Sequence, residues 1–179
     1  MNEQDLRVRK TKRALVNAMM NMLRHRSFTS VTIKGLCDES LINRATFYKH
    51  YQNKDDLLYD MLNSLTVDSH TISARALLTK PFTTSPMVIT EPLGEIITKQ
   101  QTDLKFYGVY RQFFYNYYMN LFKSIQFNRT IPKPLIAYTL VNNIFSFMAW
   151  QKDFQLHSSA DEMDRLYNEM FKMSDICKD

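Results

Sequence analysis

The stretch LINRATFYKHYQNKDDLL, residues 41–58, decides the fold. Three aromatic rings in it, among them Phe47 and Tyr51, are interspersed with basic side chains. Successive residues of a helix are rotated by about 100°, so Phe47 and Tyr51 share one face while Ala45, Thr46 and Lys49 point roughly the opposite way. One side of the predicted helix therefore suits a protein core, and the other suits an anionic partner.

Helix signals surround this stretch. Thr32 and Asn43 are good N-cap residues for two short helices joined by a tight turn, and Asn53 is a good cap for the helix that follows. Two short helices joined in this way form a helix-turn-helix, whose second member normally enters the major groove of DNA. The predicted helices span residues 9–25, 33–39, 44–51 and 54 to at least 65, with an extension of the last to about 78 left open.

The segment SVTIKGLCDESLINRATFYKHYQNKDDLL resembles the tetracycline-repressor-like (TetR/AcrR) family of bacterial transcriptional regulators. The resemblance covers about residues 9–62. It implies an all-α chain, with a three-helix helix-turn-helix head over residues 1–62 and a helical ligand-binding and dimerisation body over residues 63–179. The positions that match the family pattern are Thr32, Thr46, Phe47, Tyr48, His50, Tyr51 and Lys54.

Leu41 departs from that pattern, because the family usually has glycine at this position of the turn. A non-glycine residue at positive φ costs about 1 kcal/mol. Either the turn tolerates this strain or its geometry differs here.

The resemblance implies two sets of DNA contacts. The side chains expected to approach base edges are Arg44, Ala45, Thr46, Lys49 and Lys34, with Arg44 the reader of guanine through a bidentate contact. The side chains expected to hold phosphates are Thr32, Tyr48, His50 and Lys54. The alternatives are that Tyr48 is a core ring and that His50 and Lys34 are ordinary surface residues.

The charge is unevenly distributed along the chain. Residues 1–54 contain 11 Lys and Arg against 4 Asp and Glu, a net +7, and residues 55–179 contain 12 against 14, a net −2. This asymmetry favours a nucleic-acid-binding face, although a solvated basic tail would look the same. With no apolar leader at the N-terminus and no apolar run of the roughly 18 residues that a spanning helix needs, we expect a cytoplasmic protein without membrane contact.

The body is rich in aromatic residues. Three prolines between Thr79 and Pro92 predict a loop or broken helix, either a gate to a pocket or a linker. Residues 103–127 include ten Phe or Tyr. From these we predict Phe106, Tyr110 and Phe114 as a row lining a pocket for a small hydrophobic or aromatic effector, with an ordinary core as the alternative.

The last two predicted helices have much apolar surface. The helix 135–152 is apolar on almost every face, and Ser159 and Glu162 form a capping box for the last helix. In the resembled family the final two helices form a four-helix homodimer interface, which sets two heads on a palindromic operator. The alternative is that the helix 135–152 is the core of a monomer.

Three functions follow, in order of preference. The first is a homodimeric repressor released from DNA by a ligand, and the second is a TetR-like activator whose body docks a protein partner instead of a small molecule. An enzyme is not expected, because the sequence has no glycine-rich phosphate loop, HExxH motif, nucleophile elbow or CxxC pair. No cofactor or metal site is predicted.

Overall fold

The computed structural model describes residues 3–67, 72–127 and 131–172, and the regular elements in these ranges are helices. The predicted all-α class is confirmed. The chain divides into two compact units, one of Met1–Thr66 with Glu91–Tyr110 and one of Val67–Thr90 with Arg111–Asp179. The boundary predicted after residue 62 divides the chain by expected role and stays a prediction.

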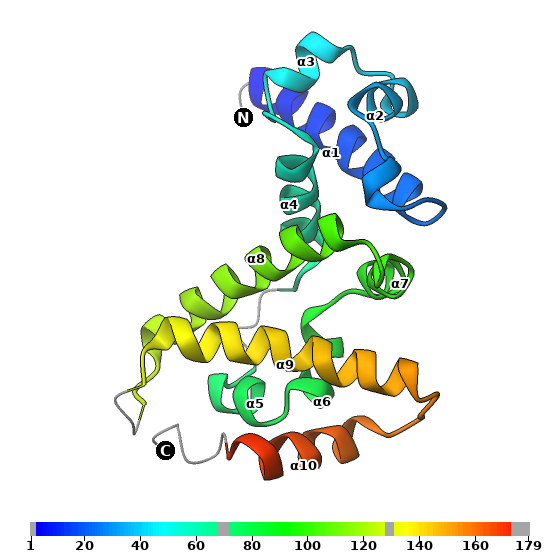
Figure 1. Cartoon of the computed structure of the whole chain (residues 1–179). Helices are drawn as coiled ribbons and strands as arrows, with labels where there is room; N and C mark the ends of the chain where they lie inside the picture. The colour runs from blue at the N-terminus through cyan, green and yellow to red at the C-terminus, as the bar shows by residue number, and fades with distance from the viewer. Residues whose placement is uncertain (1–2, 68–71, 128–130, 173–179) are drawn as a thin grey trace. The chain divides into compact units, whose positions relative to one another are not determined.

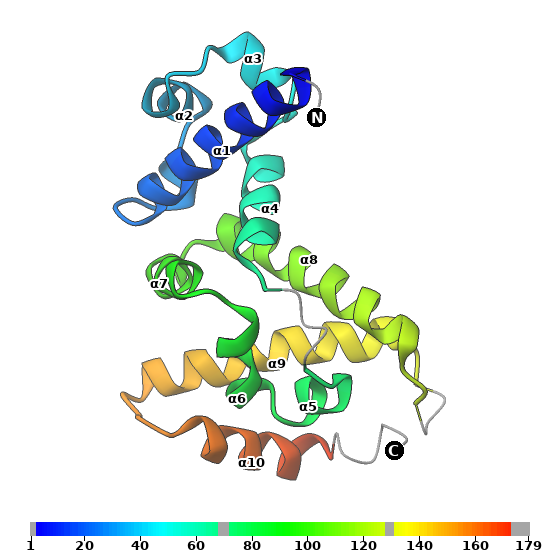
Figure 2. The ribbon, with the colours of Figure 1, turned by 180° about the vertical axis from the view of Figure 1, so that it is seen from behind.

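The first unit is built around α1, which packs against α2 and α4 (Figures 1 and 2). The fully buried side chains at its centre include Leu15, Phe28, Leu36, Phe47 and Leu58. The elements of this unit are α1 (Glu3–Leu23), the 3-10 turn η1 (Phe28–Ser30), α2 (Ile33–Ser40), α3 (Arg44–Tyr48), α4 (Lys54–Leu65), α7 (Glu91–Gln100) and residues 104–110 of α8 (Leu104–Leu121).

The predicted N-caps of the first unit are confirmed. Thr32 Oγ1 accepts from Gly35 N at 3.1 Å, and Asn43 Oδ1 accepts from Thr46 N at 2.7 Å. Asn53 Oδ1 accepts from the N–H groups of Asp55 and Asp56. Each cap satisfies backbone donors that the first turn of a helix leaves without a partner.

Several predicted bounds were wrong. The first helix begins at Glu3 instead of residue 9, and α3 ends at Tyr48 instead of residue 51. The predicted span of α4, Lys54 to Leu65, is confirmed, without the extension to about 78 that was left open. After α4 the backbone at Thr66 turns extended, with φ −97° and ψ 128°, which ends the helix.

The second unit places α5 and α6 between α9 and α10 in both views (Figures 1 and 2). Phe147 of α9 contacts Phe82 of α6, with ring centroids 5.2 Å apart, and Tyr167 of α10 at 6.0 Å. The elements of this unit are α5 (Ala74–Thr79), α6 (Pro81–Val88), residues 111–121 of α8, the 3-10 turn η3 (Phe122–Ser124), α9 (Lys133–Asp153) and α10 (Ala160–Phe171).

The proline-rich segment 79–92 is a broken helix, one of the two predicted forms. Pro81 occupies the first turn of α6, where its missing N–H costs nothing. The next two N–H groups, of Phe82 and Thr83, donate to the buried carboxylate of Asp164 on α10 at 2.9 and 3.0 Å. A cap supplied from another helix therefore stabilises an element that its own sequence disfavours.

Leu41 adopts the left-handed conformation, with φ 56° and ψ 30°, as the C-cap of α2. Its side chain is 92% exposed, so the residue contributes strain without packing. We predict that Leu41→Gly raises the free energy of unfolding by about 1 kcal/mol, because glycine adopts this conformation without a Cβ clash. Thermal unfolding measures the gain, and Leu41→Ala is the control that keeps the strain. Equal midpoints for the two variants would contradict the assignment.

Candidate nucleic-acid interface

The inner face of α3 is held by two rings. Phe47 is fully buried and Tyr51 is 4% exposed, with ring centroids 5.7 Å apart. The Tyr51 hydroxyl donates to Asp60 Oδ2 of α4 at 2.6 Å. Burial, and then this hydrogen bond to a carboxylate, raise the pKa of Tyr51. The predicted burial of the ring face is confirmed.

The opposite face of α3 is open. Ala45 and Lys49 are exposed there and Thr46 is half-buried, while Arg44 is exposed on the flank of the helix, so four of the five predicted base-reading side chains come from α3 and its C-cap. The fifth, Lys34, is exposed on α2. Their contacts with DNA bases stay predictions.

The predicted phosphate-binding residues differ in their surroundings. Tyr48 is 57% exposed, so the alternative that it is a core ring is wrong. His50 is half-buried with its ring 6.5 Å from that of Tyr51, and the Thr32 hydroxyl is engaged as the cap of α2. Their contacts with phosphates also stay predictions.

Lys54 is engaged inside the first unit. Its ammonium donates to the carbonyl oxygens of Phe28, Thr29 and Val31 at 2.7, 3.2 and 2.8 Å, and it lies 4.5 Å from the centroid of the Phe28 ring. Burial and then the nearby Lys105 charge lower the pKa of Lys54. An ammonium has three protons to donate, so a phosphate contact by Lys54 requires it to exchange one of these partners.

The turn between α1 and α2 is also held by Gln100, at the end of α7. The Gln100 amide donates to the carbonyl oxygens of Leu23 and Arg26 at 2.7 and 2.9 Å and accepts from Phe28 N at 2.9 Å. Gln100 is 2% exposed, so these bonds satisfy buried backbone groups that would otherwise be costly.

Asp103 completes this attachment while capping α8. Its carboxylate accepts from Thr29 N at 2.6 Å and the Thr29 hydroxyl at 3.0 Å, and from the N–H groups of Lys105 and Phe106. Sequence reasoning missed both Gln100 and Asp103. An aspartate just before an aromatic helix is a recognisable N-cap signal, but its bonds to Thr29 have no local signature.

The predicted pocket residues Phe106, Tyr110 and Phe114 are all buried. Phe106 and Tyr110 belong to the first unit, where Phe106 packs against Phe28 at 6.4 Å, and Phe114 belongs to the second. Their role as an effector pocket stays a prediction.

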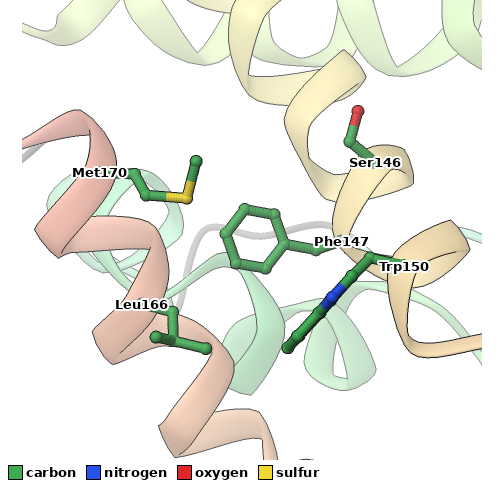
Figure 3. Close-up of a pocket in the computed structure, with 5 residues that line it drawn as sticks. All are labelled: Ser146, Phe147, Trp150, Leu166 and Met170. Carbon is green, nitrogen blue, oxygen red and sulfur yellow. The ribbon is translucent and has the colours of Figure 1, made fainter. Parts of the chain in front are cut away.

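The second unit has an apolar hollow of about 360 Å³ between α9 and α10. Figure 3 shows the Phe147 ring pointing from α9 toward α10, with Trp150 beside it and Leu166 and Met170 opposite. The fifth lining residue is Ser146.

Metal-binding clusters and membrane-spanning helices are both absent from the described ranges. No cluster of His, Cys, Asp or Glu there is suited to hold a metal ion. No helix among these residues has the length and apolar character to cross a membrane.

The geometry of the first unit is that of a helix-turn-helix protein, and comparison with known proteins extends this. The sequence profile described as bacterial regulatory proteins, tetR family, matches residues 15–61. The uncharacterized HTH-type transcriptional regulator YxbF of Bacillus subtilis (strain 168) is 41% identical over 59 residues, which are 32% of this chain and 16% of that protein's length.

Solved structures of similar fold cover nearly the whole chain. A TetR transcriptional regulator from Streptococcus agalactiae 2603V is 19% identical with a TM-score of 0.60, over 93% of this chain and 96% of that one. NalD, the secondary repressor of the MexAB-OprM multidrug efflux pump in Pseudomonas aeruginosa, is 16% identical with a TM-score of 0.55, over 96% and 98%. Residues 15–61, which contain the helix-turn-helix, thus match the TetR family profile, and the all-α fold is similar to that of these solved structures.

The hydrogen bonds to Asp103 make stability depend on pH. Burial alone would raise its pKa, but the bonds from Thr29, Phe106 and Lys105 outweigh burial and lower it. A lowered folded-state pKa gives stability that is present above the unfolded pKa of about 4 and is lost as the pH falls through the folded value. We predict that Asp103→Asn lowers the free energy of unfolding by about 2 kcal/mol at pH 7 and by less at pH 3.

Denaturant unfolding at both pH values tests this, with Asp38→Asn, an exposed site on α2, as the control. An equal loss at pH 7 and pH 3 for Asp103→Asn would show that its carboxylate does not act through charge.

Proposed function

We propose that the protein is a homodimeric regulator that binds a palindromic DNA operator through α3 and is released from it by a small effector. The observation that carries the proposal is the two-sided character of α3, where fully buried Phe47 lies opposite exposed Ala45 and Lys49, with Arg44 exposed on the flank. A short helix held by its apolar side and presenting small, polar and cationic side chains outward fits the major groove. A duplex in the chromosome is its target, so the protein acts in the cytoplasm.

The contacts divide by chemistry. Arg44 hydrogen-bonds a guanine edge, assisted by Ala45, Thr46, Lys49 and Lys34, and these side chains carry sequence preference. Tyr48, His50, Thr32 and Lys54 hold phosphates and fix the register of the head on the duplex.

The dimer forms through α9 and α10. Apolar side chains remain open on these helices: Leu135 is 56% exposed, Tyr138 44%, Trp150 37% and Met170 67%. Trp150 and Met170 also line the hollow between these helices. Exposed apolar groups of this kind are typical of a protein contact, and a two-fold dimer would cover them with the same surface of a second copy. Two heads then meet successive major grooves.

The effector is a small hydrophobic or aromatic molecule, and buried Phe114 is the predicted lining residue that lies in the second unit. The protein represses transcription until the ligand binds. NalD, whose fold is similar, is described as a repressor. A ligand shifts the equilibrium only by its difference in affinity for the two states.

The second candidate is an activator whose body docks a protein partner. The observation that favours it is Phe154, at the C-terminal end of α9, which is 70% exposed, with Leu156 38% exposed beside it in sequence. A partner protein bound there would replace the small effector.

The reading face is tested with Arg44→Ala and DNA from upstream of the protein's own gene. We predict a loss of preference at one base position, worth about 1–3 kcal/mol, because a bidentate guanine contact is removed. Competition among single-base operator variants measures it, and Lys123→Ala in η3 is the control with the same change of charge. An unchanged ranking of operator variants would refute the assignment of Arg44.

The dimer is tested with Met170→Asp. We predict that the dissociation constant of the dimer rises by about 30-fold or more, roughly 2 kcal/mol, because a carboxylate would be buried without a partner. Sedimentation equilibrium measures it. Met87→Asp is the control, since Met87 is 58% exposed on α6 of the same unit. Equal dissociation constants for the two variants would remove α10 from the interface.

A further inference from the structure

The first turns of α1 lie outside the core. The helix begins at Glu3, yet every side chain from Asp5 to Lys10 is exposed, and the first buried one in the part described is Leu15. At 1.5 Å per residue, this leading segment extends about 15 Å ahead of the packed part of the helix. Helical turns without a packed face add little stability of their own, so packing does not explain this segment.

The segment is strongly basic. Between Glu3 and Arg13 it has five cations against two acids, Glu3 and Asp5, a net +3. The cations are Arg7, Arg9, Lys10, Lys12 and Arg13.

These cations do not all point the same way. The buried side of α1 is marked by Leu15, Ala18 and Met22. At about 100° per residue, Lys10 and Arg13 lie on the side opposite to these residues, where no core neighbour can take up their charge. Both side chains are exposed. The outward side of the segment is therefore cationic.

The contacts of Lys12 show that the segment lies close to the C-terminal end of α3. Its ammonium lies 3.3 Å from Asp60 Oδ2 and 5.3 Å from the centroid of the Tyr51 ring, three residues after the end of α3. In Figure 1 the start of α1 lies at the same end of the first unit as α3. A polyanion seated on the outer face of α3 thus meets the leading turns of α1 as well.

We propose that the leading turns of α1 form a second DNA-contact surface, in which Lys10 and Arg13 bind backbone phosphates flanking the bases that α3 reads. The inference rests on the proposed function and adds a contact surface to it. Double-stranded DNA is the occupant because its densely charged phosphate backbone attracts exposed cations, and these cations lie at the same end of the first unit as α3. These long side chains on an exposed helix neutralise phosphates and add no base preference.

The test is a salt series with the double variant Lys10→Gln/Arg13→Gln in the full chain. Each phosphate contact contributes about −0.9 to the slope of log affinity against log salt. A dimer of this variant loses four contacts, so the slope becomes shallower by about 3.6, and between 50 and 200 mM salt the variant loses about 150-fold less affinity than the wild type. At low salt it binds the operator and an unrelated duplex more weakly by the same factor.

The matched control is Arg26→Gln/Lys123→Gln, which removes the same charge at exposed sites outside α9 and α10. Arg26 follows the opposite end of α1, and its backbone carbonyl, which accepts from Gln100, is unchanged. This control should keep the wild-type slope.

The outcomes separate the two proposals. A wild-type slope in Lys10→Gln/Arg13→Gln overturns the second surface and leaves the reading by α3 intact. An equal change in both double variants overturns it too, because net charge alone would then explain the effect. A wild type that binds no duplex refutes the proposed function itself.

Discussion

The burial of Phe47 is the constraint on which the first unit depends. The helix that carries it, α3, has five residues, too few to hold an orientation by backbone hydrogen bonds alone. Its direction is set by Phe47 in the core and by Asp60, which accepts from both the Tyr51 hydroxyl and the Lys12 ammonium. Because the rings take one side, Ala45 and Lys49 on the other side and Arg44 on the flank remain available to a ligand.

A second set of contacts fixes the turn between α1 and α2, just before the helix-turn-helix. Lys54, Gln100 and Asp103 hydrogen-bond five carbonyl oxygens and two N–H groups between Leu23 and Val31. Two of these three residues come from the α7–α8 region, so the head is completed by chain that lies about seventy residues further on. A change in the position of α7 would reach α2 through these bonds.

Local patterns were enough to predict the caps and the buried face of α3, because Asn43 and its donor are three residues apart and Phe47 and Tyr51 are four apart. Contacts over long sequence separations were not predictable. The helix α6 depends on a cap from Asp164, about eighty residues away. The start of α1 was missed because a helix segment without a buried face has no apolar period to detect, and the engagement of Lys54 by three carbonyl groups required coordinates.

The most direct test of the central claim, that α3 presents its outer face to the major groove, is methylation interference on the duplex that the protein binds best. Guanine N7 lies on the major-groove edge and adenine N3 on the minor-groove edge. The account predicts that methylation at guanine N7 blocks binding in two half-sites about one helical turn, or a multiple of it, apart. Interference only at adenine N3, or none at guanine N7, would contradict it.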